Sequence, residues 1–519
     1  MDPQQKFVKR RLKWIGFCAG GLVLVLVVFA VEEHERGRWK LNGHLHRLRA
    51  KGEVYSVVAL EPKHPPAEQN AFADLTNIAN RLEPIVIHLD DAPPPLRFAA
   101  PGKEIVAWRL NQWGRNSKIT NDWSRLGPEL EEARELLGLL HAAARKPAYD
   151  SGFDYRKGFL VFQLGSLALV KRPAEILEDA TLYELHGGHL DAACEHLCAM
   201  VRLAADQKPE PLVICQIVRE ACASMAFSAT WQALQAPGWN EAQLAALQAA
   251  WEGGDFARDM GLAMEMERAM TFDFFEQLKS SKAKLAFALE QRGYRGDVFG
   301  GSFAPLLAHG FMLQWVQGPS WRIAWADQDE LRALVRWQVM IERQRSARTN
   351  SWAALSSKSG SEDDLDLFFA AFMPDAVQMS WYDRLRFVFS SDAFSIKDAV
   401  IRGAICAQVQ QQMAATAIAI QRFRLQTGEL PADLAALVPK YLSALPRDGM
   451  DGKTLRYRLP PEGGFVLYSV GLDGKDDGRD STPVTDKRNY YQIWDGRDTV
   501  WPPAATDEEA LAAMKSAKD

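Results

Sequence analysis

The chain has 519 residues, of which 47% are hydrophobic and 24% are charged, and its formal net charge is −5. This length and hydrophobic content are enough for a large buried core divided into two or three domains. The acidic balance argues against a nucleic-acid partner, because phosphate binding needs a basic face.

The sequence begins with a basic segment that leads into an apolar one. Residues 1–14 contain five lysines and arginines against one aspartate, and residues 15–31 are an uncharged apolar run with Trp14 as an interfacial anchor. The positive-inside rule predicts a single-pass protein of a bacterial inner membrane, with residues 1–14 cytoplasmic and the bulk of the chain extracytoplasmic. The alternative is a cleavable signal peptide, with residues 28–30 (Val-Phe-Ala) as the peptidase site. An uncleaved anchor is favoured because the apolar run is longer than usual in signal peptides.

Residues 32–121 form a predicted stalk followed by a mixed segment. The polar run 32–53 is typical of a helical stalk, and the proline-rich run 61–70 ends before a predicted helix over 70–82. Residues 83–121 combine the short apolar run "IVIHL" with proline-rich stretches, which fits either a strand or an irregular loop.

Residues 122–342 are predicted to form an array of α-helical hairpins. In 173–206, two apolar stripes at helical spacing flank the Gly187 and Gly188 turn, as in one tetratricopeptide-type pair of helices. Asn240 and Gln243 have the spacing of a capping box, which predicts a helix that ends near Gly253. No 34-residue period repeats, so the array is irregular. Residues 343–394 are predicted to hold a linker and short helices, because 343–366 is polar and rich in serine.

One cluster of histidines and cysteines contains residue types that bind metals. Its members are His186, His189, Cys194, His196 and Cys198. A zinc site is one interpretation. Core thiols with surface histidines are favoured, since no paired CxxC or HExxH spacing is present. Cys215 and Cys222 are too far apart on one helix to bridge each other, but either could meet Cys194 or Cys198 across a hairpin.

Two further segments could carry chemistry. Glu265, Glu267, Arg268 and Asp273 lie in a strongly apolar helical run, where carboxylates could act as acid or base; an ion pair between helices is the favoured interpretation. Residues 299–325 are apolar with glycine and proline hinges. They could bind a ligand or touch the membrane surface, and buried packing between helices is the common alternative.

Residues 395–505 predict a small α+β module. Apolar positions at helical spacing indicate a helix over 398–427, with Ser395 as a possible N-cap and Gly428 at its end. A short second helix after Pro431 is stopped by Pro439. Residues 454–459 and 465–470 then have the composition of two strands joined by the hairpin loop "PPEGG".

This order of elements resembles the C-terminal domain of the type II secretion major pseudopilins, and also the end of many membrane-anchored helical bacterial proteins. The resemblance covers about a fifth of the chain and is carried by "G.LP..L..LVP.YL", "P.D...GK.L.Y" and "YSVGLDGKDDG". The matching residues are Gly428, Leu430, Pro431, Leu434, Leu437, Pro446, Asp448, Gly452, Tyr457, Tyr468, Ser469, Gly471, Asp473 and Gly474. The N-terminus departs from that family, because Gly16 and Phe17 lie inside the apolar run and Gly21 stands where those proteins have a glutamate.

The resemblance implies a calcium ion in the loop after "YSVGLDG". Its ligands would come from Asp473, Asp476, Asp477 and Asp480, with the carbonyl of Leu472. An Asp-rich, Gly-rich turn supplies the hard oxygen ligands that calcium prefers. A solvated acidic turn is the alternative. An EF-hand is not indicated, because a lysine interrupts the loop and the closing glutamate is missing.

The predicted fold class is therefore mainly α: a transmembrane helix, an irregular helical hairpin array, a pseudopilin-like module with a β-hairpin, and a tail over 506–519. The expected function is a membrane-anchored extracytoplasmic interaction or scaffolding protein, linked to secretion or other envelope proteins, because helical arrays present long surfaces for protein contacts. The alternatives are an envelope hydrolase or peptidase with its site among the helices, and a calcium-stabilised structural module. Fold analogy alone does not establish function.

Overall fold

The computed structural model describes residues 3–82, 96, 98–103, 123–158, 168–207, 210–293, 316–357, 380–390, 398–461, 463–482 and 493–516. Within these ranges the chain is mainly helical, with one small antiparallel sheet near its C-terminus. The predicted segment 83–121 and the N-cap Ser395 fall largely or wholly outside the described residues.

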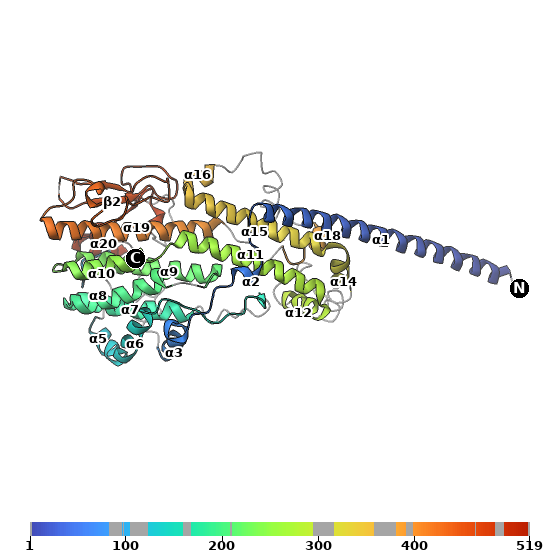
Figure 1. Cartoon of the computed structure of the whole chain (residues 1–519), viewed down its shortest axis with the longest axis horizontal. Coiled ribbons are helices and arrows are strands. Elements are labelled where there is room, and N and C mark those ends of the chain that lie inside the picture. Colours follow the sequence, from blue (N-terminus) through green and yellow to red (C-terminus); the bar gives the residue numbers. More distant parts are fainter. Residues whose placement is uncertain are drawn as a thin grey trace.

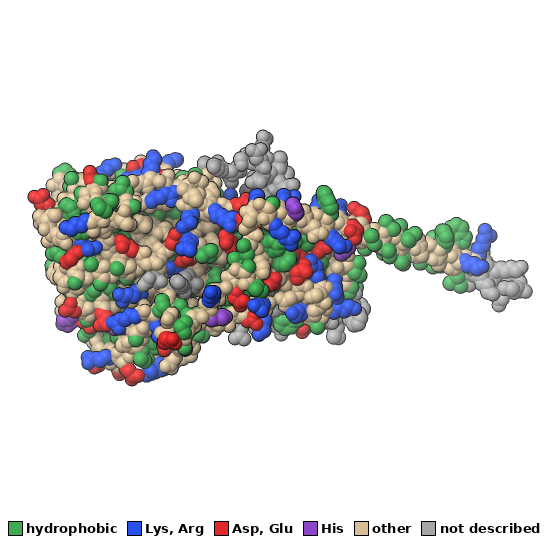
Figure 2. Space-filling model, in the orientation of Figure 1, with side chains coloured by type: hydrophobic (Ala, Val, Ile, Leu, Met, Phe, Trp, Pro, Cys, Tyr) green, Lys and Arg blue, Asp and Glu red, His purple; other side chains and the backbone are tan. Residues whose placement is uncertain are grey.

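Helix α1 (Pro3–Ala50) is a single continuous helix whose two halves have different surroundings. The first half projects from the body and is covered with exposed hydrophobic side chains (Figures 1 and 2). Among the described residues, α1 is the helix long and apolar enough to cross a membrane. The second half is not the free stalk expected from its polarity, because Leu41, Leu45 and Leu48 are buried against Leu334. Its apolar residues recur every three or four positions, which gives it a narrow face that packs on the body.

The body consists of helices packed side by side (Figure 1). Helix α11 packs along α15, α7 packs against α8 and α9, and α1 packs along α15 and the π-helix η6. The bounds are α2 (Val57–Leu60), η1 (Ala67–Gln69), α3 (Phe72–Arg81), α5 (Trp123–Glu132), α6 (Arg134–Ala144), α7 (Ala168–Gly187), α8 (Leu190–Val201), the π-helix η4 (Arg202–Asp206), α9 (Val213–Gln235), α10 (Glu241–Glu252), α11 (Phe256–Ser280), α12 (Lys282–Gly293), α14 (Gly318–Ser320), η6 (Trp321–Trp325), α15 (Ala326–Thr349), α16 (Trp352–Ser357) and α18 (Trp381–Arg386).

Several helix predictions in the body are confirmed. The hairpin over 173–206 is formed by α7 and α8, and the predicted helix over 70–82 is α3. The capping box is present at the start of α10, where the side chains of Asn240 and Gln243 each accept the other's backbone amide. The linker prediction is wrong at its start, since α15 runs without a break to Thr349 and is held there by buried Gln344 and Ala347.

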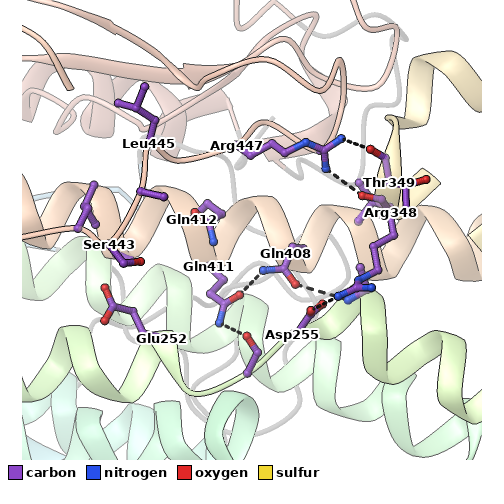
Figure 3. A pocket seen from close by; sticks show the side chains of 17 residues that line it. Glu252, Asp255, Arg348, Thr349, Gln408, Gln411, Gln412, Ser443, Leu445 and Arg447 are labelled. Atoms are coloured by element: carbon purple, nitrogen blue, oxygen red, sulfur yellow. Dashed lines mark hydrogen bonds and ion pairs between the residues drawn. The ribbon is translucent and has the colours of Figure 1, made fainter. Parts of the chain in front are cut away.

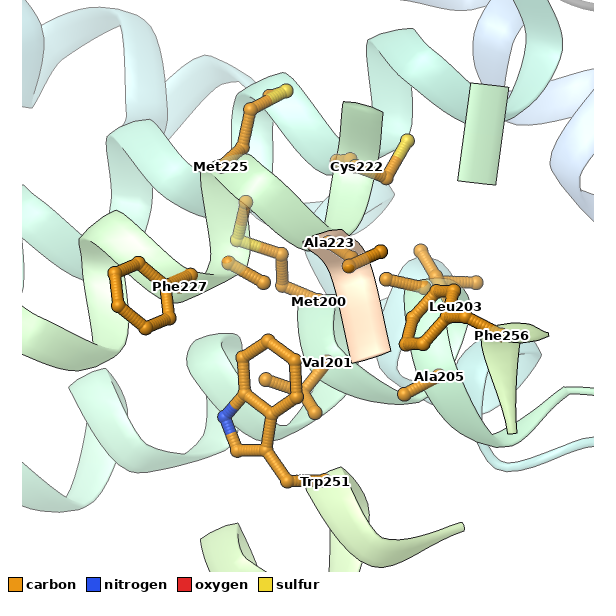
Figure 4. Close-up of a cluster of buried hydrophobic side chains, with 14 of the residues drawn as sticks. Met200, Val201, Leu203, Ala205, Cys222, Ala223, Met225, Phe227, Trp251 and Phe256 are labelled. Carbon is orange, nitrogen blue, oxygen red and sulfur yellow. The ribbon is translucent and has the colours of Figure 1, made fainter. Parts of the chain in front are cut away.

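A single hydrophobic core joins the body to the C-terminal region. Large buried side chains from α8, η4, α9, α10 and α11 form part of this core (Figure 4), including Phe227, Trp251 and Phe256. The same cluster continues through α19 (Asp398–Thr427) to Leu467 and Trp501. The described part of the C-terminal region therefore shares its core with the body.

The C-terminal region begins with α19, which has the predicted bounds and packs against α9, α10 and α11. The predicted second helix is only the 3-10 turn η9 (Leu434–Leu437). The predicted hairpin is confirmed by β1 (Arg456–Arg458) and β2 (Val466–Ser469), which pair antiparallel with Tyr457 opposite Leu467. A third strand, β3 (Thr499–Val500), pairs with β2 and was not predicted. The turn η10 (Ile493–Asp495) precedes β3, and the predicted tail contains α20 (Asp507–Ser516).

Buried Asp448 holds the turn before the sheet against β2. Its carboxylate accepts hydrogen bonds from Ser469 Oγ (2.8 Å) and from the backbone amide of Val470 (3.0 Å), and it pairs with Arg456 (3.2 Å). A buried carboxylate needs such partners, because a charge left without them in the interior is costly. This gives a structural role to one of the residues on which the resemblance rests.

Candidate functional site

A groove of about 720 Å³ lies between α19, the start of α11, the end of α15 and the segment that leads into the sheet (Figure 3). Its residues thus come from the helical body and from the C-terminal region together. The described lining residues are Glu252, Gly254, Asp255, Ala257, Arg348, Thr349, Ile405, Gln408, Gln411, Gln412, Ala415, Leu442, Ser443, Ala444, Leu445, Arg447 and Gly449.

Three glutamines of α19 form the floor of the groove. Gln411 Nε2 donates to the backbone carbonyls of Trp251 and Gly254, the latter at 2.8 Å, and Gln408 Nε2 donates to Gln411 Oε1. The amide of Gln411 thereby satisfies carbonyls at and just after the end of α10 that have no partner within the helix. Gln412 has no side-chain hydrogen-bond partner in the described chain, and Figure 3 shows it beside the loop that carries Ser443.

Two arginines form one end of the groove. Arg348 pairs with Asp255 (2.8 Å), whose other oxygen accepts the backbone amide of Arg258 (2.8 Å) as the N-cap of α11. Arg447 donates to the carbonyls of Arg348 (2.9 Å) and Thr349 (3.2 Å), which lie at the C-terminal end of α15. A cation at this end of a helix is favoured by the helix dipole. The two arginines thereby fix the C-terminal region to α11 and α15.

The chemistry of the groove is that of a binding surface. It presents amide groups, a hydroxyl and charges of both signs, together with exposed Leu445. Its described lining contains no histidine or cysteine, and the carboxylate of Glu252 lies beside Ser443 in Figure 3. These groups can donate and accept hydrogen bonds and can pair with charges of either sign.

The aspartates of the predicted calcium loop make local contacts within the protein. Asp473 and Asp480 each accept a hydrogen bond from the backbone amide two residues later, at 3.0 and 2.9 Å. Asp476 accepts the hydroxyl of Tyr468 (3.0 Å) and pairs with Arg456 (3.4 Å). Burial acts to raise the pKa of Asp476, but hydrogen bonds from the backbone amide of Gly478 and from Tyr468 and Arg456 together hold that pKa below its usual value.

The same loop is organised around buried Asp498, which the sequence analysis did not single out. Its carboxylate accepts the backbone amides of Asp477 (3.3 Å), Arg479 (2.7 Å) and Asp480 (2.9 Å). Among the described residues, no three acidic, histidine or cysteine side chains form a metal-ligand group. In this structure Asp476 is engaged with Arg456 and Tyr468, and calcium binding to the loop stays a prediction.

The charged residues of α11 are separated rather than gathered in a cleft. Arg268 is fully buried and bonds to Glu53 Oε2 (3.0 Å) and to the carbonyl of Val54 (2.8 Å), just beyond α1. Glu265 pairs with Arg345 of α15 (2.7 Å), which also pairs with Glu53. These contacts confirm the interpretation of this segment as an ion pair between elements.

The two remaining carboxylates of this segment have other surroundings. Glu267 accepts the backbone amide of Val213 (2.7 Å) at the start of α9, and burial raises its pKa to about 7. Asp273 is half-buried, and burial followed by the charge of Glu276 raises its pKa. Since Glu265 and Glu267 have different partners at separate places, they do not form an acid–base pair.

The histidines and cysteines around the α7–α8 turn do not converge either. His186 stacks on Trp123, with ring centroids 4.4 Å apart, and His189 pairs with Glu184 (2.8 Å) at the surface. The expectation of core thiols is confirmed for Cys194 and Cys198, whose sulfur atoms are 3.9 Å apart and not bonded.

His196 differs from the expectation of a surface residue. It is buried, and its Nδ1 lies 2.9 Å from Nε2 of His141. Burial lowers the pKa of His196 to about 4, so this pair is uncharged at neutral pH. All six cysteines of the chain are free, so the disulfide considered for Cys215 or Cys222 is not formed in this structure.

The groove residues could have been noticed in the sequence, but their role could not. "QVQQQM" at 408–413 places glutamines in an otherwise apolar helix, which is unusual for a buried element. Which of them face a groove depends on α10, α15 and the 442–449 segment, and these approach α19 only in the folded chain.

The fold and groove define a class of protein rather than a named family: a helical body that shares one core with a small C-terminal sheet, carried on one long apolar helix. Comparison with protein-family models, with curated proteins and with solved structures finds no match for this chain.

Proposed function

We propose that this protein is an interaction or scaffolding protein anchored in a bacterial inner membrane by residues 15–31, with its body on the extracytoplasmic side. The observation that carries the proposal is the continuity of α1, which passes from an exposed apolar half into a half packed on the body. The ion pairs of Glu53 with Arg268 and Arg345 then fasten the chain just beyond α1. The body is therefore joined to its anchor without a flexible stalk, as suits a component that holds a partner in a fixed place.

We infer that the partner is an envelope protein that places an extended polar segment in the groove on α19. The free amide of Gln412, the hydroxyl of Ser443 and exposed Leu445 can contact the backbone and side chains of such a segment. A link to the secretion machinery rests on the resemblance of the C-terminal region to pseudopilins and is part of this proposal.

Crosslinked capture from native membranes tests the proposal. Truncation after Gly428 would remove residues that belong to the common core, so a point variant is the sharper tool. Gln412→Trp should fill the groove and abolish capture of envelope proteins that the wild-type chain retains. Gln69→Trp, at an exposed position of η1 outside the groove, should leave capture unchanged. Equal capture by both variants would rule out the groove as the contact surface.

Calcium binding to the Asp-rich loop is a separate proposal that rests on the resemblance. If the loop binds calcium, millimolar calcium should raise the melting temperature relative to chelator, and Asp473→Ala with Asp477→Ala should abolish the rise. An unchanged melting temperature in the wild-type chain would mean that Asp498 and Arg456 hold the loop without a metal.

The hydrolase or peptidase alternative gains no support from the described residues. The carboxylates that suggested it are engaged with Arg345 and with the start of α9.

A further inference from the structure

The second half of α1 and α15 run in parallel, so their residues can be placed at matching levels. The side chain of Gln328 donates to the carbonyl of Glu33 (2.7 Å), and Lys51 pairs with Glu342 (3.2 Å). These two pairs are 295 and 291 residues apart in sequence, so the register is nearly constant along the contact.

Extending this register toward the membrane places η6 and α14 beside the apolar half of α1. Ile323 is five residues before Gln328, about 7 Å nearer the proposed membrane at helical rise, and comes level with about residue 28. Phe29 is 39% exposed, less than the other large hydrophobic side chains of that half, as expected where η6 approaches it. The body thus reaches back along the segment that is proposed to cross the bilayer.

The π-helix η6 has one face in the core and one face free. Trp321 is fully buried, donates from its indole nitrogen to Asp329 Oδ2 (2.8 Å) and packs edge-on against Phe389. Ile323, two residues later, is 60% exposed, and Val316 before α14 is 44% exposed. With Trp321 fixed by Asp329 and Phe389, Ile323 lies on the exposed face of η6.

The charge of this stretch fits a bilayer surface. Residues 316–325 contain Arg322 and no acidic side chain, and Arg322 has no partner in the described chain. Exposed aliphatic side chains beside an arginine are the composition of segments that lie in the headgroup region, where the arginine contacts anionic phosphates.

We propose that α14 and η6 form a second membrane contact, in which Ile323 and Val316 enter the headgroup region beside α1. The occupant of this face is the lipid surface rather than a protein, because the face is continuous with the apolar half of α1 and lies at its level. The proposal rests on the anchoring of residues 15–31, and its test separates the two.

The test uses the full chain with Cys18→Ala, reconstituted in vesicles of phosphatidylethanolamine and phosphatidylglycerol. Ile323→Cys carries an environment-sensitive fluorophore, and lipids with a nitroxide on the acyl chain serve as quenchers. Val25→Cys in the apolar half is the control for anchoring. Leu425→Cys, exposed near the far end of α19, is the control for a position away from the bilayer. The Cys18→Ala chain without a new cysteine measures labelling of the buried thiols.

Quenching at position 323 of at least half that at position 25, with none at 425, is the expected result. Quenching at 25 with none at 323 overturns the second contact and leaves the anchor intact. No quenching at 25 overturns the anchoring itself. A third outcome is that the fluorophore at position 323 is not quenched by the nitroxide lipids and reports an apolar environment only at high protein density. In that case a second copy of the protein covers this face, and the proposed lipid contact is wrong. Val316→Cys repeats the measurement should Ile323→Cys fail to fold.

Discussion

At the scale of single residues, the charges with most influence on stability are those buried between elements. Arg268 is fully buried and bonds to Glu53, to the carbonyl of Val54 and to Gln338 of α15. Hydrogen bonds and charges from Arg345 and Arg268 outweigh burial and lower the pKa of Glu53 to about 2. The group joins the end of α1 to α11 and α15, so its loss would affect three parts of the chain.

Replacing Arg268 by methionine should lower the free energy of unfolding by roughly 3 kcal/mol, because the buried carboxylate of Glu53 loses a partner. Chemical denaturation measures this change. The matched control is Arg134→Met, which removes an exposed pair with Glu131 and should cost less than about 1 kcal/mol. Equal effects of the two variants would contradict a special role for the buried pair.

Glu220 makes stability depend on pH in the neutral range. Its Oε1 atom is buried without a partner in the described chain, and burial raises its pKa to about 8 despite the nearby charge of Arg219. A raised pKa means that the folded state holds the proton more tightly. Protonated Glu220 therefore gives its full stabilisation of the folded state below about pH 4.5, its pKa in the unfolded chain. This stabilisation is lost as the pH rises through about 8.

Glu220→Gln should consequently lie within about 1 kcal/mol of the wild-type stability at pH 5 and exceed it at pH 8 by on the order of 4 kcal/mol. Denaturation curves at both values test this. Glu68→Gln, at an exposed position, is the control. If the difference in free energy of unfolding between wild type and Glu220→Gln is the same at pH 5 and at pH 8, Glu220 does not titrate between these pH values.

At the scale of elements, the C-terminal sheet depends on close backbone contact at Gly471, just after β2. Its φ is +68°, and a Cβ there would lie 2.0 Å from the carbonyl oxygen of Arg497. Gly463 in the hairpin loop has φ +95° with nothing within 4 Å of a Cβ. Alanine substitutions at these two glycines therefore separate the free-energy cost of the left-handed backbone conformation from the cost of a steric clash.

We expect Gly471→Ala to destabilise the protein by roughly 2–4 kcal/mol, since the segment before β3 must move away. Gly463→Ala should cost only about 1 kcal/mol, the price of the left-handed conformation. Thermal unfolding of both variants distinguishes them, and similar melting temperatures would show that the 497–498 segment can shift freely.

The elements differ in how far local sequence determines them. The bounds of α19 and the hairpin of β1 and β2 followed from periodicity and turn residues, because these signals are local. β3 is two residues long and depends on pairing with β2, so the local sequence of residues 499–500 does not predict a strand. Likewise, the polar second half of α1 packs on α15 through only a few leucines, and polarity alone suggested a free stalk.

The candidate site shows the same limit more strongly. The acidic loop was visible as a run of aspartates, yet its organising residue, Asp498, lies 18 to 21 positions after the amides that it binds. The groove on α19 combines four separate segments, and only the run of glutamines could have drawn attention to it.

At the scale of the whole molecule, the contact of α1 with α15 decides whether the body is fixed to the long apolar helix. A Cβ at Gly37 would lie 2.7 Å from Cγ of Gln328, whereas one at Gly43 would have nothing within 4 Å. Gly37→Leu should therefore separate the helices, cost roughly 1–3 kcal/mol and expose residues 32–50 to protease. Gly43→Leu should leave the protease pattern unchanged. Rapid cleavage in both variants, or in neither, would contradict the packing described.

If residues 15–31 span a membrane as proposed, the parallel course of α1 and α15 also sets a height above the bilayer. Twenty residues separate Gln328, level with Glu33 near the lipid, from Arg348 at the groove, which is about 30 Å at helical rise. As the protein diffuses in the membrane, the groove stays within a thin layer at a constant distance from the membrane surface. Partners that present their binding segment in that layer meet it at a raised effective concentration, whereas a segment that lies flat on the lipid never reaches it.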